Sequence, residues 1–237
     1  MPPAPPDLPA RNILAIDAAG ASCSVALWSG GRVAAHRFLA MGRGQSERLV
    51  PMIGDVMAEW GGAFDDLDAI AVTTGPGGFT GVRIGLATAR GLALARGLPV
   101  IGITTFEVVA AAAAPAERAG RRVVAAIDSK RAAVFLQAFE SDLVAAGPPA
   151  EVPTADLPGA LPAGALLLTG DAAVQVAAVL AAAGRSDVVV AAAAGPADAA
   201  LLAARAALRD PAAAGPAEPV YLRPPDVTPP KDRVPRR

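Results

Sequence analysis

Short apolar runs that alternate with helical repeats are the feature that most constrains this chain. Residues 13–17 form an apolar run ending in the acid Asp17, which is typical of a buried central strand. Residues 23–28 and 32–38 predict two further strands joined by a Ser-Gly-Gly turn, so the chain should open with three antiparallel strands. Helices are then predicted over 46–60, 81–96 and 106–114, separated by strands over 69–73 and 99–103. This order predicts an α/β fold.

The same pattern restarts in the second half of the chain. Residues 115–122 carry a proline, a glycine and several charges, and we interpret them as the join between two lobes. Strands are predicted over 123–128, again ending in an acid (Asp128), and over 134–139, 166–169 and 188–190. Over 141–163 we expect a loop with at most short strands. Helices over 172–183 and 197–208 complete the series. We therefore predict two lobes of related topology, with a disordered leader (1–11), an N-terminal lobe (12–115), a C-terminal lobe (116–225) and a basic tail (226–237).

Composition narrows the class of protein. Apolar residues make up 53% of the chain and charged residues 18%, which is enough for a sizeable core. A net charge of −1 argues against a protein that binds nucleic acid by itself through phosphate contacts. The single cysteine, Cys23, allows no intrachain disulfide and fits a reducing compartment. Neither a signal peptide nor a transmembrane run is visible, so we expect a cytoplasmic protein without membrane contact.

The glycine-rich stretch 74–85 has two readings. As a set of backbone amides that leads into a helix, it could hold an anion, with Thr80 as the N-cap and Phe79 and Ile84 as a hydrophobic staple. Alternatively, its glycines only allow a tight strand-to-helix turn and close helix packing. The first reading gives weak nucleotide-binding candidates, namely Asp17, Gly75, Gly77, Gly78 and Thr80.

Other chemistry-bearing residues are sparse. Ala18 and Ala19 follow Asp17 and offer only backbone amides, which weakens a nucleotide site there. The cluster at 128–131 (Asp-Ser-Lys-Arg) predicts either a contact between lobes or with a partner, or a solvated turn with local ion pairs. His36 is the single histidine, so a zinc site of several histidines is excluded and a structural or surface role is expected. No Gly-x-Ser-x-Gly element of serine hydrolases is present.

Two helices carry more apolar and small residues than one core contact requires. Small residues recur every four positions in the helix at 81–96, which allows close approach by another helix, either within the fold or from a partner. The helix at 46–60 is apolar around much of its circumference, so we expect one face on the sheet and the other covered by a partner. The predicted partner interface comprises Leu49, Val50, Ile53, Met57, Gly81, Arg83, Gly85 and Ala89. A charged residue at Ile53 or Gly85 is expected to prevent the complex while the monomer stays folded.

Three stretches together resemble a known family. Residues 13–17 (Ile-Leu-Ala-Ile-Asp), 75–85 (Gly-Pro-Gly-Gly-Phe-Thr-Gly-Val-Arg-Ile-Gly) and 219–223 (Pro-Val-Tyr-Leu-Arg) closely resemble the TsaB family, also known as YeaZ. The likeness runs over residues 12–225 and is strongest at 69–107. It implies a two-lobed actin-like, Hsp70-like ATPase (ASKHA) fold, each lobe a mixed sheet with flanking helices. It also implies a place in the bacterial machinery that forms N6-threonylcarbamoyladenosine beside the tRNA anticodon.

The resemblance further implies a non-catalytic subunit. In that family a related subunit, TsaD, carries out the transfer and holds a metal through a His-x-x-x-His motif, which this chain lacks. The implied role is a heterodimer with TsaD through the helices near 46–60 and 81–96, joined by the ATPase TsaE. TsaC would supply the threonylcarbamoyl adenylate, and contact with tRNA would be indirect. No intrinsic cofactor or metal is expected, ATP or ADP is expected only in the assembled complex, and the isolated chain could form a homodimer through the same helices.

The chain departs from the family pattern in two places, and two other functions compete. Ala18 and Ala19 stand where family members often have threonine or serine, and Gln45 stands where many have histidine. Both departures weaken independent nucleotide chemistry. The main alternative is an independent small-molecule kinase that uses Asp17 and the loop 75–78 for ATP. A peptidase that depends on His36 or Ser46 is a third reading.

Overall fold

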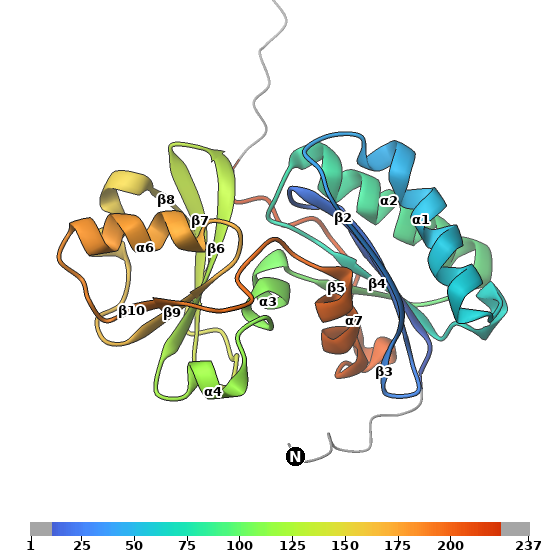
Figure 1. The fold of residues 1–237 in the computed structure, drawn as a ribbon. Coiled ribbons are helices and arrows are strands. Elements are labelled where there is room, and N and C mark those ends of the chain that lie inside the picture. The colour runs from blue at the N-terminus through green and yellow to red at the C-terminus, as the bar shows by residue number, and fades with distance from the viewer. Residues whose placement is uncertain (1–10, 224–237) are drawn as a thin grey trace, which may run out of the picture.

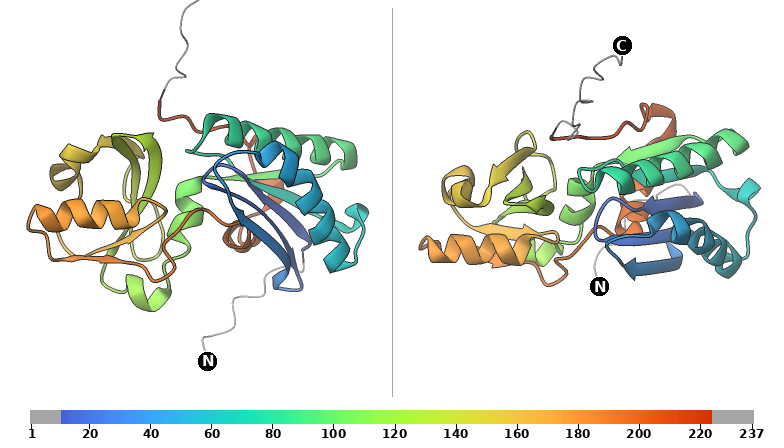
Figure 2. Two further views of the ribbon diagram at one scale, coloured as in Figure 1. Left: turned by 45° about the horizontal axis from the view of Figure 1, so that its top comes forward. Right: turned by 90° about the horizontal axis from the view of Figure 1, so that it is seen from above.

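Two five-stranded sheets lie side by side in the computed structural model, which describes residues 11–223 (Figures 1 and 2). The strand orders are β3-β2-β1-β4-β5 and β10-β9-β6-β7-β8. In each sheet the first strand of the lobe is central, pairs antiparallel with the next strand and pairs parallel with the fourth. The two lobes therefore have related topology, as predicted, and the fold is the expected two-lobed actin-like α/β class. Residues 1–10 of the predicted leader and the predicted tail lie outside the described residues.

The elements of the first half agree with the predicted pattern. Two helices differ clearly in their bounds: the second begins at Phe79 and not at the predicted residue 81, and the third is shorter than the predicted 106–114. In chain order the elements are β1 (Ile13–Asp17), β2 (Ser22–Ser29), β3 (Arg32–Ala40), α1 (Gln45–Trp60), a 3-10 turn (Phe64–Asp66), β4 (Ala69–Thr73), α2 (Phe79–Arg96), β5 (Val100–Ile103) and α3 (Thr105–Ala110).

The second half also follows the predicted order. Two differences are short helices: α4 lies inside the segment that we interpreted as the join, and α5 lies inside the predicted loop region. The elements are α4 (Pro115–Arg118), β6 (Arg122–Arg131), β7 (Ala133–Phe139), β8 (Ala150–Pro153), a 3-10 turn (Thr154–Asp156), α5 (Leu157–Ala160), β9 (Leu166–Thr169), α6 (Ala173–Ala182), β10 (Val188–Val190), α7 (Ala199–Ala207) and a last 3-10 turn (Pro211–Ala213).

Two helices cross between the lobes. α7 follows the second sheet in sequence but packs on β1, β2 and β3 of the first sheet, whereas α3 follows the first sheet and packs on β6 and β7 of the second (Figure 1). Part of the segment predicted for the C-terminal lobe therefore lies in the N-terminal lobe. The predicted boundary separates the sheets but not the helices that cover them.

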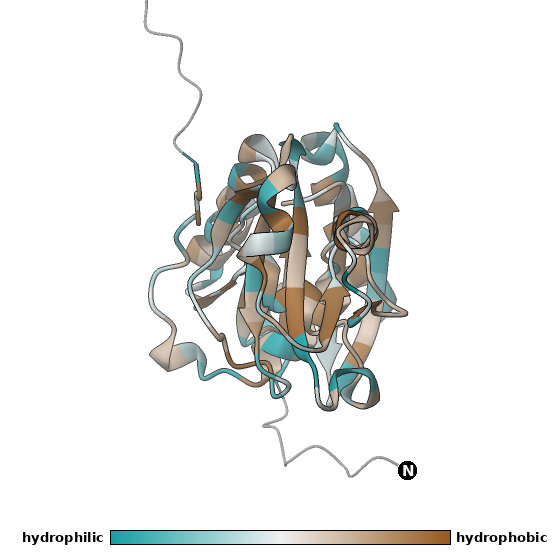
Figure 3. Cartoon of the chain, turned by 90° about the vertical axis from the view of Figure 1, so that its left-hand side faces the viewer, coloured by the Kyte–Doolittle hydropathy of each residue, from teal (hydrophilic) through white to brown (hydrophobic). Residues whose placement is uncertain are grey.

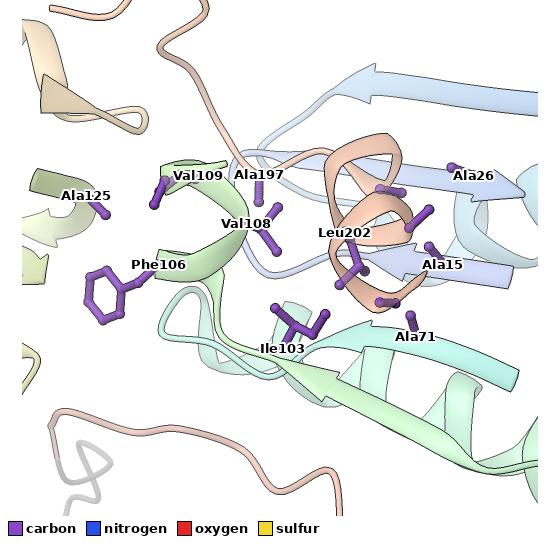
Figure 4. Close-up of a cluster of buried hydrophobic side chains, with 14 of the residues drawn as sticks. Ala15, Ala26, Ala71, Ile103, Phe106, Val108, Val109, Ala125, Ala197 and Leu202 are labelled. Carbon is purple, nitrogen blue, oxygen red and sulfur yellow. The ribbon is translucent and has the colours of Figure 1, made fainter. Parts of the chain in front are cut away.

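The crossing helices share one apolar core with both sheets. Figure 4 shows Leu202 of α7 beside Ala15 and Ala71 of the first sheet, and Phe106 of α3 directed toward Ala125 of the second. These side chains are almost completely buried. Small alanines on the first sheet let the α7 backbone approach closely, which explains how an alanine-rich helix can form a dense contact. Seen from the second-lobe side, the strands are predominantly apolar, as expected for sheets covered on both faces (Figure 3).

α1 and α2 cover the opposite face of the first sheet. On β1, Leu14 and Ile16 join their cluster, whereas Ile13 and Ala15 belong to the core around α7. This alternation is the side-chain period of a strand with both faces buried.

The small-residue row of α2 packs inside its own lobe. A Cβ on Gly81 would lie 2.1 Å from the carbonyl oxygen of Ala18, and Gly85 lies against Val72 and Ala18. Ala89 is fully buried. Of the two readings left open, the row therefore serves close packing within the fold.

The prediction for charged residues at Ile53 and Gly85 is consequently wrong. Ile53 is buried in the cluster between α1 and the sheet, and Gly85 faces β4. A carboxylate at either position would be buried without a partner, which costs several kcal/mol and would unfold the monomer before any interface is affected.

Substituting two glycines of α2 should give opposite changes in stability. Gly81→Ala places a methyl group against a backbone carbonyl and should lower the free energy of unfolding by about 1–3 kcal/mol. Gly91→Ala is the matched control, because its Cβ would meet no atom within 4 Å and alanine favours the helix, so stability should rise by up to about 1 kcal/mol. Urea unfolding of both variants measures this difference. Equal effects would contradict the close approach of α2 to the end of β1.

Candidate functional site

A cavity of about 490 Å³ lies between the two lobes, at the ends of β1 and β6. The first lobe contributes the glycine-rich turn and the start of α1, and the second contributes the end of β6 together with Asp171. Of the predicted nucleotide-binding residues, Gly77, Gly78 and Thr80 line this cavity. Asp17 and Gly75 do not.

Asp17 is enclosed by its own lobe. Its carboxylate accepts a hydrogen bond from the Thr73 hydroxyl (2.5 Å), with longer contacts from the Ala19 amide (3.3 Å) and the Ser22 hydroxyl (3.5 Å). Burial raises the pKa of Asp17 to about 6, against the opposing effect of these hydrogen bonds. With no exposed surface, the carboxylate cannot reach a phosphate or a metal from the cavity in this structure.

The glycine-rich turn is built for close packing. A Cβ on Gly77 would lie 2.2 Å from the carbonyl oxygen of Ala19, and one on Gly75, where φ is +99°, would lie 2.9 Å from that of Val220. The Gly78 amide donates to the Ala19 carbonyl (2.7 Å) and is therefore already occupied. These contacts favour the reading in which the glycines allow a tight turn.

The predicted N-cap of α2 is wrong. The helix begins at Phe79 with Gly78 as its N-cap, and Thr80 lies within the first turn without a capping hydrogen bond. The bond from Gly78 to Ala19 fixes the turn before Thr80, so the helix starts earlier than the side-chain pattern indicated. Phe79 consequently forms no staple with Ile84 and instead contacts Arg83 and Tyr221.

The cluster at 128–131 contains local ion pairs and also faces the first lobe. The Lys130 ammonium and amide both donate to the Asp128 carboxylate, each at 2.7 Å. Burial opposes the ionisation of Asp128, but these bonds outweigh it and lower its pKa. Asp171 accepts from the Asp128 amide (2.9 Å), and burial raises the pKa of Asp171. Both predicted readings of this cluster thus hold in part.

His36 has a structural partner that sequence reasoning missed. Its Nε2 lies 2.7 Å from the carboxylate of Asp198, which also caps α7 by accepting from the Ala200 amide. Burial opposes the ionisation of Asp198, but the bonds from His36 and Ala200 lower its pKa. An aspartate directly before a helix is the signal that could have identified this cap. Ser46, in contrast, lines the cavity between the lobes.

Most of the predicted partner interface is buried within the chain. Leu49, Val50, Ile53 and Met57 lie on α1, yet only Val50 is exposed (62%). On α2, Gly81, Gly85 and Ala89 pack against the sheet, and Arg83 is exposed. The apolar residues of α1 are needed by its own sheet, so most of the predicted interface residues do not face outward. That α1 and α2 bind a partner stays a prediction.

Within residues 11–223, no group of three or more His, Cys, Asp or Glu side chains could hold a metal ion. Over the same part of the chain, no helix is long and apolar enough to cross a membrane.

Comparison with known proteins identifies the family. Residues 40–150 match the family model "TsaD: tRNA N6-adenosine threonylcarbamoyltransferase". The chain is 43% identical over 131 residues to the tRNA threonylcarbamoyladenosine biosynthesis protein TsaB of Escherichia coli, covering 55% of this chain and 56% of that protein. A crystal structure from Pseudomonas aeruginosa, described as an uncharacterized protein with similarity to peptidase YEAZ, matches with a TM-score of 0.73 and 30% identity over 90% of this chain and all of that one. The chain belongs to the TsaB (YeaZ) family.

The sequence matches to curated proteins cover only part of each chain. The chain spans about half the length of the curated relatives it matches. A shorter segment is 51% identical over 65 residues to the tRNA N6-adenosine threonylcarbamoyltransferase of Erythrobacter litoralis, which is 27% of this chain and 19% of that enzyme. The chain therefore resembles both TsaB proteins and the transferase.

Removing the charge of Asp17 should alter the pH dependence of stability. Because the pKa of Asp17 is raised from 3.8 to about 6 on folding, the folded state binds more protons than the unfolded state in this window. As pH rises from the lower to the higher of these pKa values, the contribution of Asp17 to the free energy of unfolding should therefore fall, by an amount on the order of 3 kcal/mol. Asp17→Asn keeps an acceptor for Thr73 and should abolish that fall.

Denaturant unfolding at several pH values measures this effect as the free energy of unfolding of the wild type minus that of the variant. Asp55→Asn, at an exposed acid of α1, is the control and should leave the profile almost unchanged. An identical profile for Asp17→Asn and wild type would show that the carboxylate is not desolvated in solution.

Proposed function

We propose that this chain is a non-catalytic subunit of the complex that forms N6-threonylcarbamoyladenosine in tRNA, where it binds and activates a TsaD-like catalytic subunit. The observation that carries the proposal is membership of the TsaB family, whose E. coli relative is named for this biosynthesis. The match of residues 40–150 to the TsaD model supports a related fold in the partner. Related subunits commonly associate through equivalent surfaces, so a pseudo-symmetric heterodimer is the expected form.

The arrangement of polar residues supports a non-catalytic role. Asp17 is fully buried, His36 is held by Asp198, and the Gly78 amide is bonded to Ala19. Each of these three groups therefore has a structural partner within the chain.

The outer faces of α1 and α2 are the proposed surface for the TsaD-like subunit. Val50 on α1 and Leu94 on α2 are large apolar side chains with exposures of 62% and 86%. Gly54 and Gly91 lie exposed on the same two helices, and a Cβ on either would meet no atom within 4 Å. Small residues beside apolar ones let another helix approach closely, so two helices of a partner could pack here. In the isolated chain the same face would form a homodimer.

Further components follow from the proposed complex. A TsaE-like ATPase would join the heterodimer, and ATP or ADP would bind only in the assembled complex. The alternative of an independent kinase requires a reachable carboxylate at the end of β1, and the burial of Asp17 disfavours it. Titration calorimetry of the isolated chain with ATP tests that alternative, and we expect no measurable heat of binding.

Charges on the outer helix face should prevent formation of the heterodimer. We expect Val50→Asp and Leu94→Asp to leave the monomer folded, because both side chains are exposed. Burying an unpaired carboxylate costs several kcal/mol, a large part of the roughly 8 kcal/mol of a micromolar interface. Gel filtration of each variant with the TsaD-like subunit measures the loss. Val174→Asp is the control, since Val174 is 71% exposed but lies on α6 of the other lobe.

Reconstitution tests the function itself. Purified TsaD-like, TsaC-like and TsaE-like proteins should form modified tRNA with this chain and much less without it, as measured by mass spectrometry of digested nucleosides. Equal modification without the chain would refute the proposed role. Loss of the complex with Val174→Asp but not with Val50→Asp would place the interface on the other lobe.

A further inference from the structure

A second cavity, of about 680 Å³, opens beside the glycine-rich turn. The side chains that line it suit a single-stranded nucleic acid. Its walls come from the turn 76–79, the end of β6 at 129–131 and the C-terminal segment 220–223. Among residues 11–223, four cationic side chains line it and no carboxylate does. The cations are Arg83, Lys130, Arg131 and Arg223.

Arg83 is held in place by two aromatic rings. Its guanidinium carbon lies 3.6 Å from the centroid of the Phe79 ring, and its Nε donates to the Tyr221 hydroxyl (3.0 Å). Among the described residues it has no ion pair with a carboxylate. A guanidinium carries five N–H donors, and this single bond uses one of them. Arg83 is therefore positioned to donate to an anion from outside the chain.

The rings themselves are available for stacking. Phe79 and Tyr221 lie 5.5 Å apart between centroids and are 41% and 40% exposed. Exposed aromatic side chains beside cations are the combination by which proteins bind single-stranded nucleic acid, since bases stack on the rings and phosphates meet the cations.

Lys130 reaches the cavity from a strained backbone position. Its φ is +60°, an uncommon conformation for a residue with a side chain, and it is fixed by the bonds to Asp128. Backbone strain of this kind concentrates at binding sites. Lys130 and Arg223 already pair with Asp128 and Glu151, which moderates the positive charge, whereas the described residues hold no carboxylate partner for Arg83.

We propose that this cavity binds a single-stranded segment of RNA, with a base stacked on Phe79 or Tyr221 and phosphates at Arg83 and Lys130. The choice of RNA over an acidic peptide rests on the proposed function, because tRNA is the substrate of that complex. Direct contact with RNA would replace the indirect contact that the family resemblance implies. With a net charge of −1 overall, the chain should bind RNA weakly, and only at this local patch.

Fluorescence anisotropy of a labelled tRNA anticodon stem-loop with the isolated full-length chain tests the proposal. We expect weak binding that falls as salt rises. Lys130→Gln and Arg83→Gln should each weaken binding about tenfold and make the salt slope shallower by about 0.7, as for loss of one phosphate contact on a single strand. Tyr221→Ala should weaken binding by a similar factor, in the range of one lost base stack.

The matched control is Arg96→Gln, an exposed arginine at the other end of α2, which should bind RNA like the wild type. Thermal unfolding identifies any variant that fails to fold, and the three substitutions provide independent tests. Equal weakening by Arg96→Gln, or no binding by the wild type at low salt, would overturn the proposal. If AMP or polyglutamate displaced the labelled RNA as well as unlabelled RNA does, the proposal would also be overturned. The cavity would then be a nucleotide site or an acidic-peptide site.

The test of RNA binding and the test of the proposed function can fail independently. Binding to RNA is measured without a partner, and heterodimer formation is measured by gel filtration without RNA. Lys130→Gln should retain the heterodimer while RNA binding weakens about tenfold. If the heterodimer fails to form but the RNA result stands, only the proposed partner is refuted.

Discussion

The exchange of α3 and α7 between the lobes is the constraint on which the rest of the structure depends. Each sheet has one face covered by a helix that belongs, in sequence, to the other half of the chain. Leu202 and Phe106 thereby enter one continuous apolar core with residues of both sheets. Opening the lobes would expose this core to water, at roughly 25 cal/mol for each Å² of apolar surface. The shared core therefore fixes how the glycine-rich turn faces the end of β6.

The order and kind of the elements could be predicted because periodicity is a local property of the sequence. The strands at 13–17 and 69–73 and the helix at 46–60 agree closely with the structure. Which sheet a helix covers depends on contacts between distant residues. α7 illustrates this limit, because its alanines fit several environments and give no direction. The helix was predicted near its true bounds but assigned with the lobe of its sequence neighbours.

The candidate sites show the same limit more sharply. Gly77 and Gly81 were identified from the sequence. Only the structure shows that a side chain on either glycine would collide with the backbone of Ala19 or Ala18. The environment of Asp17 depends on Thr73, which is distant in sequence and brought close by the pairing of β1 with β4. The cluster of Arg83 with Tyr221 was missed as a cluster, although both residues lie in stretches that carried the family resemblance. No local pattern joins residues so far apart.

The position of α7 at the end of the chain also orders events during synthesis. The ribosome releases β1, β2 and β3 long before it releases residues 199–207, so one face of the nascent first sheet lacks its covering helix. That face carries several alanines, which expose less apolar surface to water than leucines would. The first lobe is completed only after residues 199–207 have emerged, by which time the strands of the second sheet have emerged as well.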